Sequence, residues 1–320
     1  MVLTRHQAKL NIENSNQENS IDDAMMVIND PPLLTISRSR QEFDDDDDDN
    51  EDNDDDDDNN NNKDRTIKLG TFLERLDDFE CSSLDALMAR WPSMHARLKG
   101  MKPHLPPKKD DNRPTLVLDL DETLLHTYRE PKSDPNDYWD ADYVVYAKDR
   151  RSCLAGILRP GVTEFLVWAS GIFEVVVWTA GHDDYAQMVC KLLDPEGNLI
   201  NHMLSRRTCI RMRSAATGEI MYVKDLCALG RDLGRTFLVD NTPHAATLNL
   251  SNLIPIETFL GGSSDRELKE LRRFLESNLV RLTDRKNDMR ILLHRQLNLK
   301  RRLRERIDNW KSSQQSIPPS

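Results

Sequence analysis

The sequence has few cysteines and no long apolar run. Its five cysteines among 320 residues are scattered, without a CxxC pair and without histidines at metal-ligand spacing. This pattern argues against a zinc site and indicates a reducing compartment. No window approaches 18 consecutive apolar residues, and no apolar run follows a basic N-terminal start. We therefore expect a soluble, intracellular protein without a signal peptide or a membrane span.

Charge is distributed in blocks along the chain. The formal net charge is -11, but residues 42–64 hold fifteen acidic side chains against one lysine, a net charge of -14. The rest of the chain therefore sums to +3, and residues 281–320 alone carry eleven Lys or Arg against four acids. An acidic block and a basic tail thus flank a nearly balanced middle.

The chain changes character at about residue 66. Residues 1–65 are polar and rich in Asn, Ser and Asp, and such a segment cannot bury enough apolar surface to offset its ordering entropy, so we predict disorder. Residues 66–112 begin with apolar side chains repeated at three and four positions, which predicts helices that Pro92 should break. A linker rich in Pro and Lys follows from residue 101.

Residues 113–280 predict one α/β domain. Short apolar runs typical of buried strands alternate with segments of helical periodicity, which favours a Rossmann-like parallel sheet flanked by helices. Residues 128–158 alternate without a helical period and predict a small antiparallel β insertion after the first strand. The expected strands are 115–118, 143–146, 173–178 and 237–239, and the expected helices are 163–169, 185–193 and 265–279.

The most informative pattern is the apolar run 115–118, which ends in Asp119 and Asp121. In an extended chain, residues i and i+2 point to the same side, so both carboxylates leave the strand together. Open parallel sheets bind their ligands at this end of the strands. The two carboxylates would repel each other unless a cation lay between them, although a solvated turn shows the same pattern.

Three later segments place polar groups in a similar way. Thr179 follows the apolar run 173–178, and Asp240 and Asn241 follow the run 237–239. Lys224 lies in a third segment, next to a carboxylate. Taken singly, each segment is also common in ordinary turns or on solvated surfaces. Their joint occurrence in this order is more specific.

Together these four segments resemble the aspartate-nucleophile phosphatases of the haloacid dehalogenase superfamily, in the branch of the small C-terminal-domain phosphatases and the Dullard-like enzymes. The resemblance covers about residues 113–280. It implies that Asp119 attacks phosphorus to form an aspartyl-phosphate, and that Asp121 protonates the leaving oxygen and then activates water. Thr123 would hold the loop by hydrogen bonding.

The same resemblance implies roles for the remaining groups. Thr179 would bind a phosphate oxygen, Lys224 would balance charge in the transition state, and Asp240 would orient the lysine. Asp119, the main chain of Asp121 and Asn241 would bind Mg²⁺, the expected cofactor.

The resemblance is weaker around the substrate cleft. In the small C-terminal-domain phosphatases an apolar pocket receives a proline of the phosphorylated RNA polymerase II repeat, whereas here Arg129 replaces an aromatic residue and His182 an apolar one. The repeat is therefore one candidate among several phosphoprotein substrates. By resemblance, Arg159 would face the cleft. The expected substrate-binding residues are Tyr128, Arg129, Arg159, Arg206 and Arg207.

Residues 281–320 predict a basic amphipathic helix and tail. Its apolar stripe is expected to pack on the rest of the protein. The basic run 300–306 also has the composition of a nuclear import signal or a nucleic-acid contact. We expect a nuclear rather than a cytoplasmic location, and no nucleic-acid partner.

These observations favour a Mg²⁺-dependent protein serine/threonine phosphatase. Two alternatives remain: a non-catalytic scaffold with the same fold, and a phosphatase of small metabolites. A scaffold predicts loss of a catalytic group, and all are present. A metabolite phosphatase needs a large cap over its site, and an insertion of about thirty residues is short for that purpose.

Overall fold

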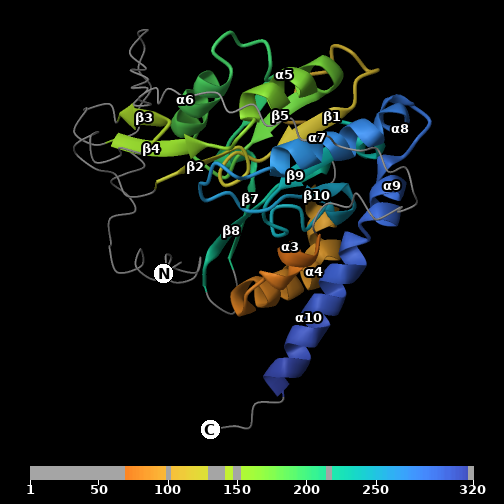
Figure 1. The fold of residues 1–320 in the computed structure, drawn as a ribbon. Helices are drawn as coiled ribbons and strands as arrows, with labels where there is room; N and C mark the ends of the chain where they lie inside the picture. The colour runs from red at the N-terminus through yellow and green to blue at the C-terminus, as the bar shows by residue number, and fades with distance from the viewer. Residues whose placement is uncertain (1–68, 99–101, 129–140, 147–152, 214–217, 316–320) are drawn as a thin grey trace, which may run out of the picture.

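The computed structural model describes residues 69–98, 102–128, 141–146, 153–213 and 218–315 (Figure 1). The acidic block and the predicted disorder of residues 1–65 lie outside these ranges. Within them, no helix is both long and apolar enough to cross a membrane.

A five-stranded parallel sheet forms the centre of the molecule, in the order β10-β9-β1-β5-β6. Strands β1, β5 and β9 are buried along their whole length, as their unbroken apolar sequences require. Strands β6 and β10 have only three residues each, too few for a clear sequence pattern. The five strands are β1 (Thr115–Leu118), β5 (Glu174–Trp178), β6 (His202–Leu204), β9 (Thr236–Asp240) and β10 (Leu253–Pro255).

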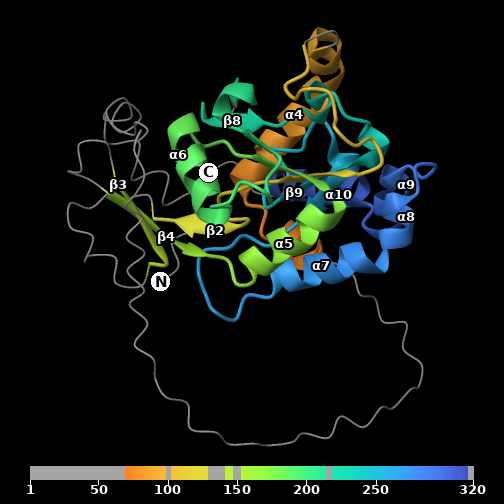
Figure 2. The ribbon, with the colours of Figure 1, turned by 90° about the horizontal axis from the view of Figure 1, so that it is seen from above.

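Helices flank this sheet. Helix α7 lies beside α5 (Figures 1 and 2). Helix α6 follows β5 and packs near β6. The three helices expected from the sequence are present with boundaries shifted by at most three residues: α5 (Val162–Ile172), α6 (Asp183–Leu193) and α7 (Glu267–Ser277). Short 3-10 turns link the later elements: η2 (Arg206–Thr208), η3 (Leu226–Leu229), η4 (Leu233–Arg235) and η5 (Leu250–Asn252).

Two small antiparallel sheets extend from this core. The predicted insertion forms β2 (Leu125–Thr127), β3 (Tyr143–Tyr146) and β4 (Cys153–Leu158), in the order β2-β4-β3. It therefore begins at Leu125, three residues earlier than expected. A second hairpin, β7 (Ile210–Arg213) and β8 (Ile220–Val223), leads into the lysine segment.

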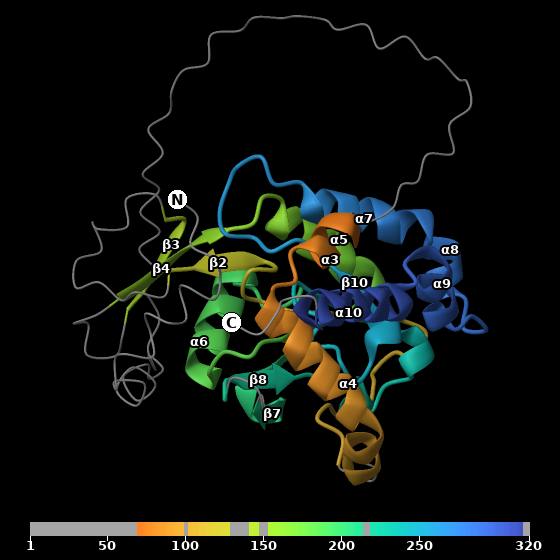
Figure 3. The ribbon, with the colours of Figure 1, turned by 90° about the horizontal axis from the view of Figure 1, so that it is seen from below.

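The N-terminal helices pack against the C-terminal helix (Figure 3). Helix α10 (Leu299–Gln315) contacts α3 (Leu69–Glu74) and α4 (Asp78–Leu98). Trp310 Nε1 donates to Asp78 over 2.9 Å, and Lys311 pairs with Asp85 at 2.6 Å. The expectation that Pro92 breaks the helix is wrong, because α4 continues to Leu98. An interior proline removes one N–H bond and crowds the carbonyl four residues earlier, and the packing of α4 against α10 offsets this cost.

The C-terminal segment is not a single helix, contrary to the sequence expectation. It forms α8 (Leu279–Thr283), α9 (Met289–Gln296) and α10. Asp288 caps α9 by accepting from Arg290 N, and Asn298 has a positive φ of 46°, which ends one helix before the next. The expected packing of the apolar stripe is confirmed: these side chains are buried in the core that also contains β1 and α3, and they are Leu282, Met289, Leu292, Leu299, Leu303 and Ile307.

Candidate active site

The topology brings three of the sequence segments to one edge of the sheet. Strand β1 lies between β9 and β5, and all three run in the same direction. Asp240 ends β9, while Asp119 and Thr179 directly follow β1 and β5. Their side chains therefore meet where parallel sheets commonly bind ligands. Lys224 reaches the same place from the end of β8.

Lys224 joins two of these carboxylates. Its Nζ lies 2.6 Å from Asp119 Oδ1 and 2.7 Å from Asp240 Oδ2. The lysine side chain is 2% exposed. Burial lowers the pKa of Lys224, but the charges of Asp119 and Asp240 outweigh burial and raise it. The ammonium group is therefore retained at neutral pH.

The negative charge of this cluster exceeds its positive charge. Asp119 Oδ2 also accepts a 2.9 Å hydrogen bond from Thr123 Oγ1. Burial raises the pKa of Asp119 to about 7, and the nearby charges of Asp240 and Asp121 add to this against the opposing effect of Lys224. Asp119 and Asp240 thus share one ammonium group while the charge of Asp121 lies nearby, and a bound cation would relieve the excess of negative charge.

The loop after β1 is tightly folded. Glu122 has a positive φ of 62°, which is uncommon for a residue other than glycine. Its N–H donates to Leu125 O over 2.6 Å, and its carbonyl accepts from Phe259 N over 2.8 Å. These bonds hold the turn that carries Asp119, Asp121 and Thr123.

Asp121 is held by two hydroxyl groups. Thr179 Oγ1 donates to its Oδ2 over 2.9 Å, and Tyr185 OH donates to its Oδ1 over 2.5 Å. The expected contact of Thr179 with a phosphate oxygen stays a prediction; in this structure its hydroxyl donates to Asp121. Tyr185 was missed by the sequence reasoning, because a tyrosine in a predicted helix has no motif that marks it.

The residues proposed for metal binding offer oxygen donors. Asn241 Nδ2 donates to Thr258 Oγ1 over 3.2 Å and to Glu122 Oε2 over 3.5 Å, which leaves the amide oxygen as an acceptor. The described residues contain no group of three or more His, Cys, Asp or Glu side chains suited to a metal. The expected Mg²⁺ ligands are the Asp119 carboxylate, the main-chain carbonyl of Asp121 and the Asn241 amide. Oxygen donors of this kind suit Mg²⁺.

Arg159 does not lie on the cleft surface. Its side chain is fully buried, and its Nε and Nη2 each donate to Asp265 over 2.8 Å. Further bonds reach the carbonyls of Thr123, at 3.0 Å, and Glu257, at 2.8 Å. These partners occupy the guanidinium group, so in this structure Arg159 supports the loop that carries Thr123.

Arg206 and Arg207 lie beside the loop that follows β5. Arg206 Nε donates to Ala180 O over 2.6 Å, its Nη1 bonds to His182 Nε2, and its guanidinium lies 4.9 Å from the ring centre of Tyr222. Arg207 pairs with Asp183 and is 82% exposed. Both arginines thus contact the segment that directly follows Thr179. Tyr128 packs its ring against His126 at 5.7 Å, and Arg129 lies outside the described residues.

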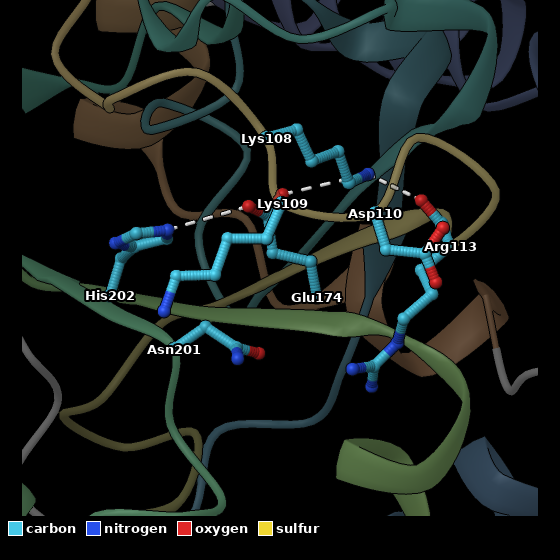
Figure 4. Close-up of a pocket in the computed structure, with 7 residues that line it drawn as sticks. All are labelled: Lys108, Lys109, Asp110, Arg113, Glu174, Asn201 and His202. Carbon is cyan, nitrogen blue, oxygen red and sulfur yellow. Dashed lines mark hydrogen bonds and ion pairs between the residues drawn. The ribbon is translucent and has the colours of Figure 1, made fainter.

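A separate charged cluster lies at the opposite edge of the sheet, where β1 and β5 begin (Figure 4). Two of its members, Lys108 and Glu174, line a cavity of about 120 Å³. Glu174 is its centre: it accepts two bonds from Arg231, at 2.7 and 2.8 Å, and one from Thr115 at 2.8 Å. Lys108 lies 3.6 Å from the same carboxylate and joins the segment before β1 to the sheet. We interpret this cluster as structural.

Comparison with known proteins identifies a family and several relatives. The family model described as NLI interacting factor-like phosphatase matches residues 114–290, more than half of the chain. CTD small phosphatase-like protein 2 of Dictyostelium discoideum is 37% identical over 179 residues, which are 54% of this chain and 29% of that protein. CTD small phosphatase-like protein 3 of Caenorhabditis elegans is 35% identical over 197 residues, 60% of this chain and 63% of the relative.

The human CTD small phosphatase-like protein is 34% identical over 191 residues, 59% of this chain and 63% of that protein. This chain thus spans less than two thirds of the length of each of these relatives. Among solved structures, the RNA polymerase II CTD phosphatase Fcp1 matches with 20% identity and a TM-score of 0.37, over 72% of this chain and 58% of that one.

Proposed function

The chain belongs to the NLI interacting factor-like phosphatase family, and on this basis we propose that it hydrolyses phosphate monoesters on serine or threonine side chains of proteins. The observation that carries this proposal is the cluster around Asp119, in which Lys224 and Thr123 hold the two carboxylate oxygens in place. Such fixed contacts prepare a carboxylate for in-line attack on phosphorus.

Asp119 is the proposed nucleophile. Its oxygen attacks phosphorus, the bond from phosphorus to the ester oxygen breaks, and an aspartyl-phosphate forms. Lys224 reduces the repulsion between the carboxylate and the dianionic phosphate group, and Asp240 keeps that lysine in place through its 2.7 Å contact. Water then hydrolyses the aspartyl-phosphate and frees Asp119.

Asp121 is the proposed acid and base. It lies two residues after Asp119, on the same loop, and gives a proton to the leaving oxygen as the ester bond breaks. In the second step it takes a proton from the attacking water. A single carboxyl group that alternates between two protonation states can serve both steps.

Asp119, Asn241 and the main chain of Asp121 are the proposed ligands of Mg²⁺. The excess of negative charge around Lys224, together with the acceptor oxygen of Asn241, fits this ion. When bound, Mg²⁺ would neutralise charge on the phosphate oxygens.

The expected substrate is a phosphoprotein. A human relative is named "Carboxy-terminal domain RNA polymerase II polypeptide A small phosphatase 1". The phosphorylated repeat of RNA polymerase II, a nuclear target, is one candidate substrate of this protein. In the described residues the insertion forms the small β2-β4-β3 sheet, and with so small a cover the site would accept a protein segment from bulk solvent. Arg206 and Arg207 would contribute charge beside it, and Arg129 and Tyr128 remain further candidates for substrate contact.

We predict that hydrolysis of a phosphoserine peptide requires Mg²⁺ and is abolished in Asp119→Asn and in Asp121→Asn. The first variant removes the attacking charge and the second the proton carrier. Initial rates with and without EDTA measure this. Full activity in EDTA, or in either variant at unchanged protein purity, would disprove the mechanism and favour a scaffold function.

A second prediction concerns the substrate class. The kcat/KM for a phosphoserine peptide should exceed that for glucose phosphate by about a hundredfold, since two charge-assisted contacts each contribute roughly 1.5 to 3 kcal/mol. Added salt should act through KM more than through kcat, because exposed charges are screened. Equal efficiency on both substrates, without a salt effect, would instead support a metabolite phosphatase.

A further inference from the structure

A chain of hydroxyl groups connects the insertion sheet to Asp121. Tyr185 OH, on α6, lies 2.5 Å from Asp121 Oδ1 and 2.6 Å from Thr127 Oγ1, on β2. Thr127 Oγ1 in turn lies 2.6 Å from Tyr143 OH, on β3. Both tyrosines are buried, with 8% exposure for Tyr185 and 2% for Tyr143. Four side chains from separate elements thus form one continuous path.

The number of protons in this chain determines the direction of its hydrogen bonds. A carboxylate only accepts, so the single proton of Tyr185 goes to Asp121. Tyr185 must then accept from Thr127, and Thr127 must accept from Tyr143. Each hydroxyl group in this path thus donates one hydrogen bond towards Asp121.

The two oxygens of Asp121 have different surroundings. Oδ1 accepts from Tyr185, which is linked to the insertion sheet through Thr127, whereas Oδ2 accepts from Thr179, which is also buried and begins the loop after β5. Resemblance assigns to Thr179 a contact with the phosphate group, and such a contact would release Oδ2. Tyr185 would keep Oδ1 in place at the same time. Oδ2 is therefore the oxygen available to exchange a proton with the substrate.

We propose that Tyr185 is a positioning residue that fixes the carboxyl group of Asp121, so that Oδ2 delivers the proton to the leaving oxygen, and that Thr127 and Tyr143 extend this support from the insertion sheet. The inference rests on the proposed function. In the first step Oδ2 loses its proton as the ester bond breaks, and the resulting carboxylate keeps the hydrogen bond from Tyr185. In the second step Oδ2 recovers a proton from water.

The position of Gly156 supports this arrangement. Gly156 lies opposite Tyr143 in the antiparallel pair of β3 and β4. A Cβ atom at this position would overlap the hydroxyl and the ring of Tyr143 and the carbonyl of His126. A side chain there would therefore displace the tyrosine at the far end of the chain of hydroxyls.

The test uses two substrates that differ in their need for an acid. A phosphoserine peptide has a poor leaving group that must be protonated, whereas dinitrophenyl phosphate leaves as a stable anion. For Tyr185→Phe we expect kcat/KM to fall about tenfold or more on the peptide, and by less than about threefold on the dinitrophenyl ester, because only the proton transfer is misaligned. Tyr143→Phe should show the same pattern with a smaller loss.

Three further measurements complete the test. Asp121→Asn should show the same dependence on the leaving group, with a larger loss. Thr247→Val removes another buried hydroxyl, which donates to the carbonyl of His244 over 2.7 Å. This variant should leave kcat/KM unchanged on the peptide and on the dinitrophenyl ester. Thermal unfolding of each variant reports on folding.

The outcomes separate the two proposals. An equal loss on both substrates in Tyr185→Phe, or no loss on either, would overturn the positioning role. The proposed function would still stand in that case if Asp121→Asn shows the dependence on the leaving group. Activity of Asp121→Asn equal to that of the wild type on both substrates would overturn the proposed function itself, and the role of Tyr185 with it.

Discussion

At the scale of single residues, burial determines how much stability is lost when an ion pair is broken. Lys224 and Lys311 each have a carboxylate oxygen at 2.6 Å, yet their surroundings differ. Lys224 is 2% exposed and has two carboxylate partners, whereas Lys311 is 44% exposed and has one. A buried carboxylate that loses its partner becomes an uncompensated charge, while an exposed one is solvated by water.

These two lysines offer a matched pair of variants. Lys224→Ala should lower the free energy of unfolding by about 3 kcal/mol or more in the absence of divalent cations, since it leaves Asp119 and Asp240 unpaired. Lys311→Ala should lower it by less than about 1 kcal/mol. Urea unfolding in the presence of EDTA measures both. Similar values for the two variants would show that the cluster around Asp119 does not depend on its ammonium group.

Burial also affects the ionisation of the thiol groups. Burial is the main cause that raises the pKa of Cys190 to about 12, and the same cause raises the pKa of Cys209 to about 11. Neutral thiols react slowly with alkylating reagents. Treatment of the folded protein with an alkylating reagent should therefore leave the rate of hydrolysis unchanged, as expected if the nucleophile is a carboxylate.

At the scale of elements, one charged group joins the segment before β1 to the sheet. Glu174 begins β5, Arg231 follows η3, and Lys108 precedes β1, so their contacts cross three parts of the fold. Burial raises the pKa of Glu174, but hydrogen bonds from Arg231 and Thr115 and the charge of Lys108 lower it to about 2. The folded state therefore favours the carboxylate more than the unfolded state does.

Stability should accordingly depend on pH through Glu174. Because its folded pKa, about 2, lies below the ordinary value of 4.5, its contribution is complete above pH 4.5 and is lost as pH falls towards 2. Glu174→Gln should destabilise the protein at pH 6, and the difference from the wild type should shrink by pH 2. Glu276→Gln, in an exposed helical pair with Arg272, serves as the control. A difference that does not change with pH would contradict this assignment.

At the scale of the whole molecule, the N-terminal and C-terminal helices belong to the same core as the sheet. Phe72, Leu76 and Leu84 are buried together with Leu303 and Ile307 and with the side chains of β1. Arg306 Nη2 also donates to the carbonyl of Leu76 over 2.7 Å. The helical segments that flank the family match are therefore part of the described fold.

Two truncations test this organisation. Removal of residues 1–65 should change kcat on a small ester by less than about tenfold, or 1.4 kcal/mol of barrier, because the proposed catalytic groups lie between Asp119 and Asn241. Removal of residues 1–98 also deletes α3 and α4 and exposes the apolar side of α10, so the unfolding temperature should drop. Initial rates and thermal unfolding measure the two effects. A tenfold loss in the shorter truncation would show that the acidic block contributes to catalysis.

The sequence by itself determined the parts of this protein that depend on neighbouring residues. Unbroken apolar runs predicted β1, β5 and β9, and the spacing of Asp119 and Asp121 predicted a site at the end of β1. These features follow from local periodicity, because the direction of successive side chains in an extended chain does not depend on the tertiary fold around it. Lys224 and Asp240 were also recognisable, because short motifs contain them.

Only the tertiary structure decided which distant groups meet. The contact between Tyr185 and Asp121 joins positions 64 residues apart, and that between Arg159 and Asp265 joins positions 106 apart. No local pattern encodes either contact. The buried ion pair of Arg159 and the chain of hydroxyls at Tyr185 arise because packing removes these groups from water, and a buried polar group must then find its partner within the protein.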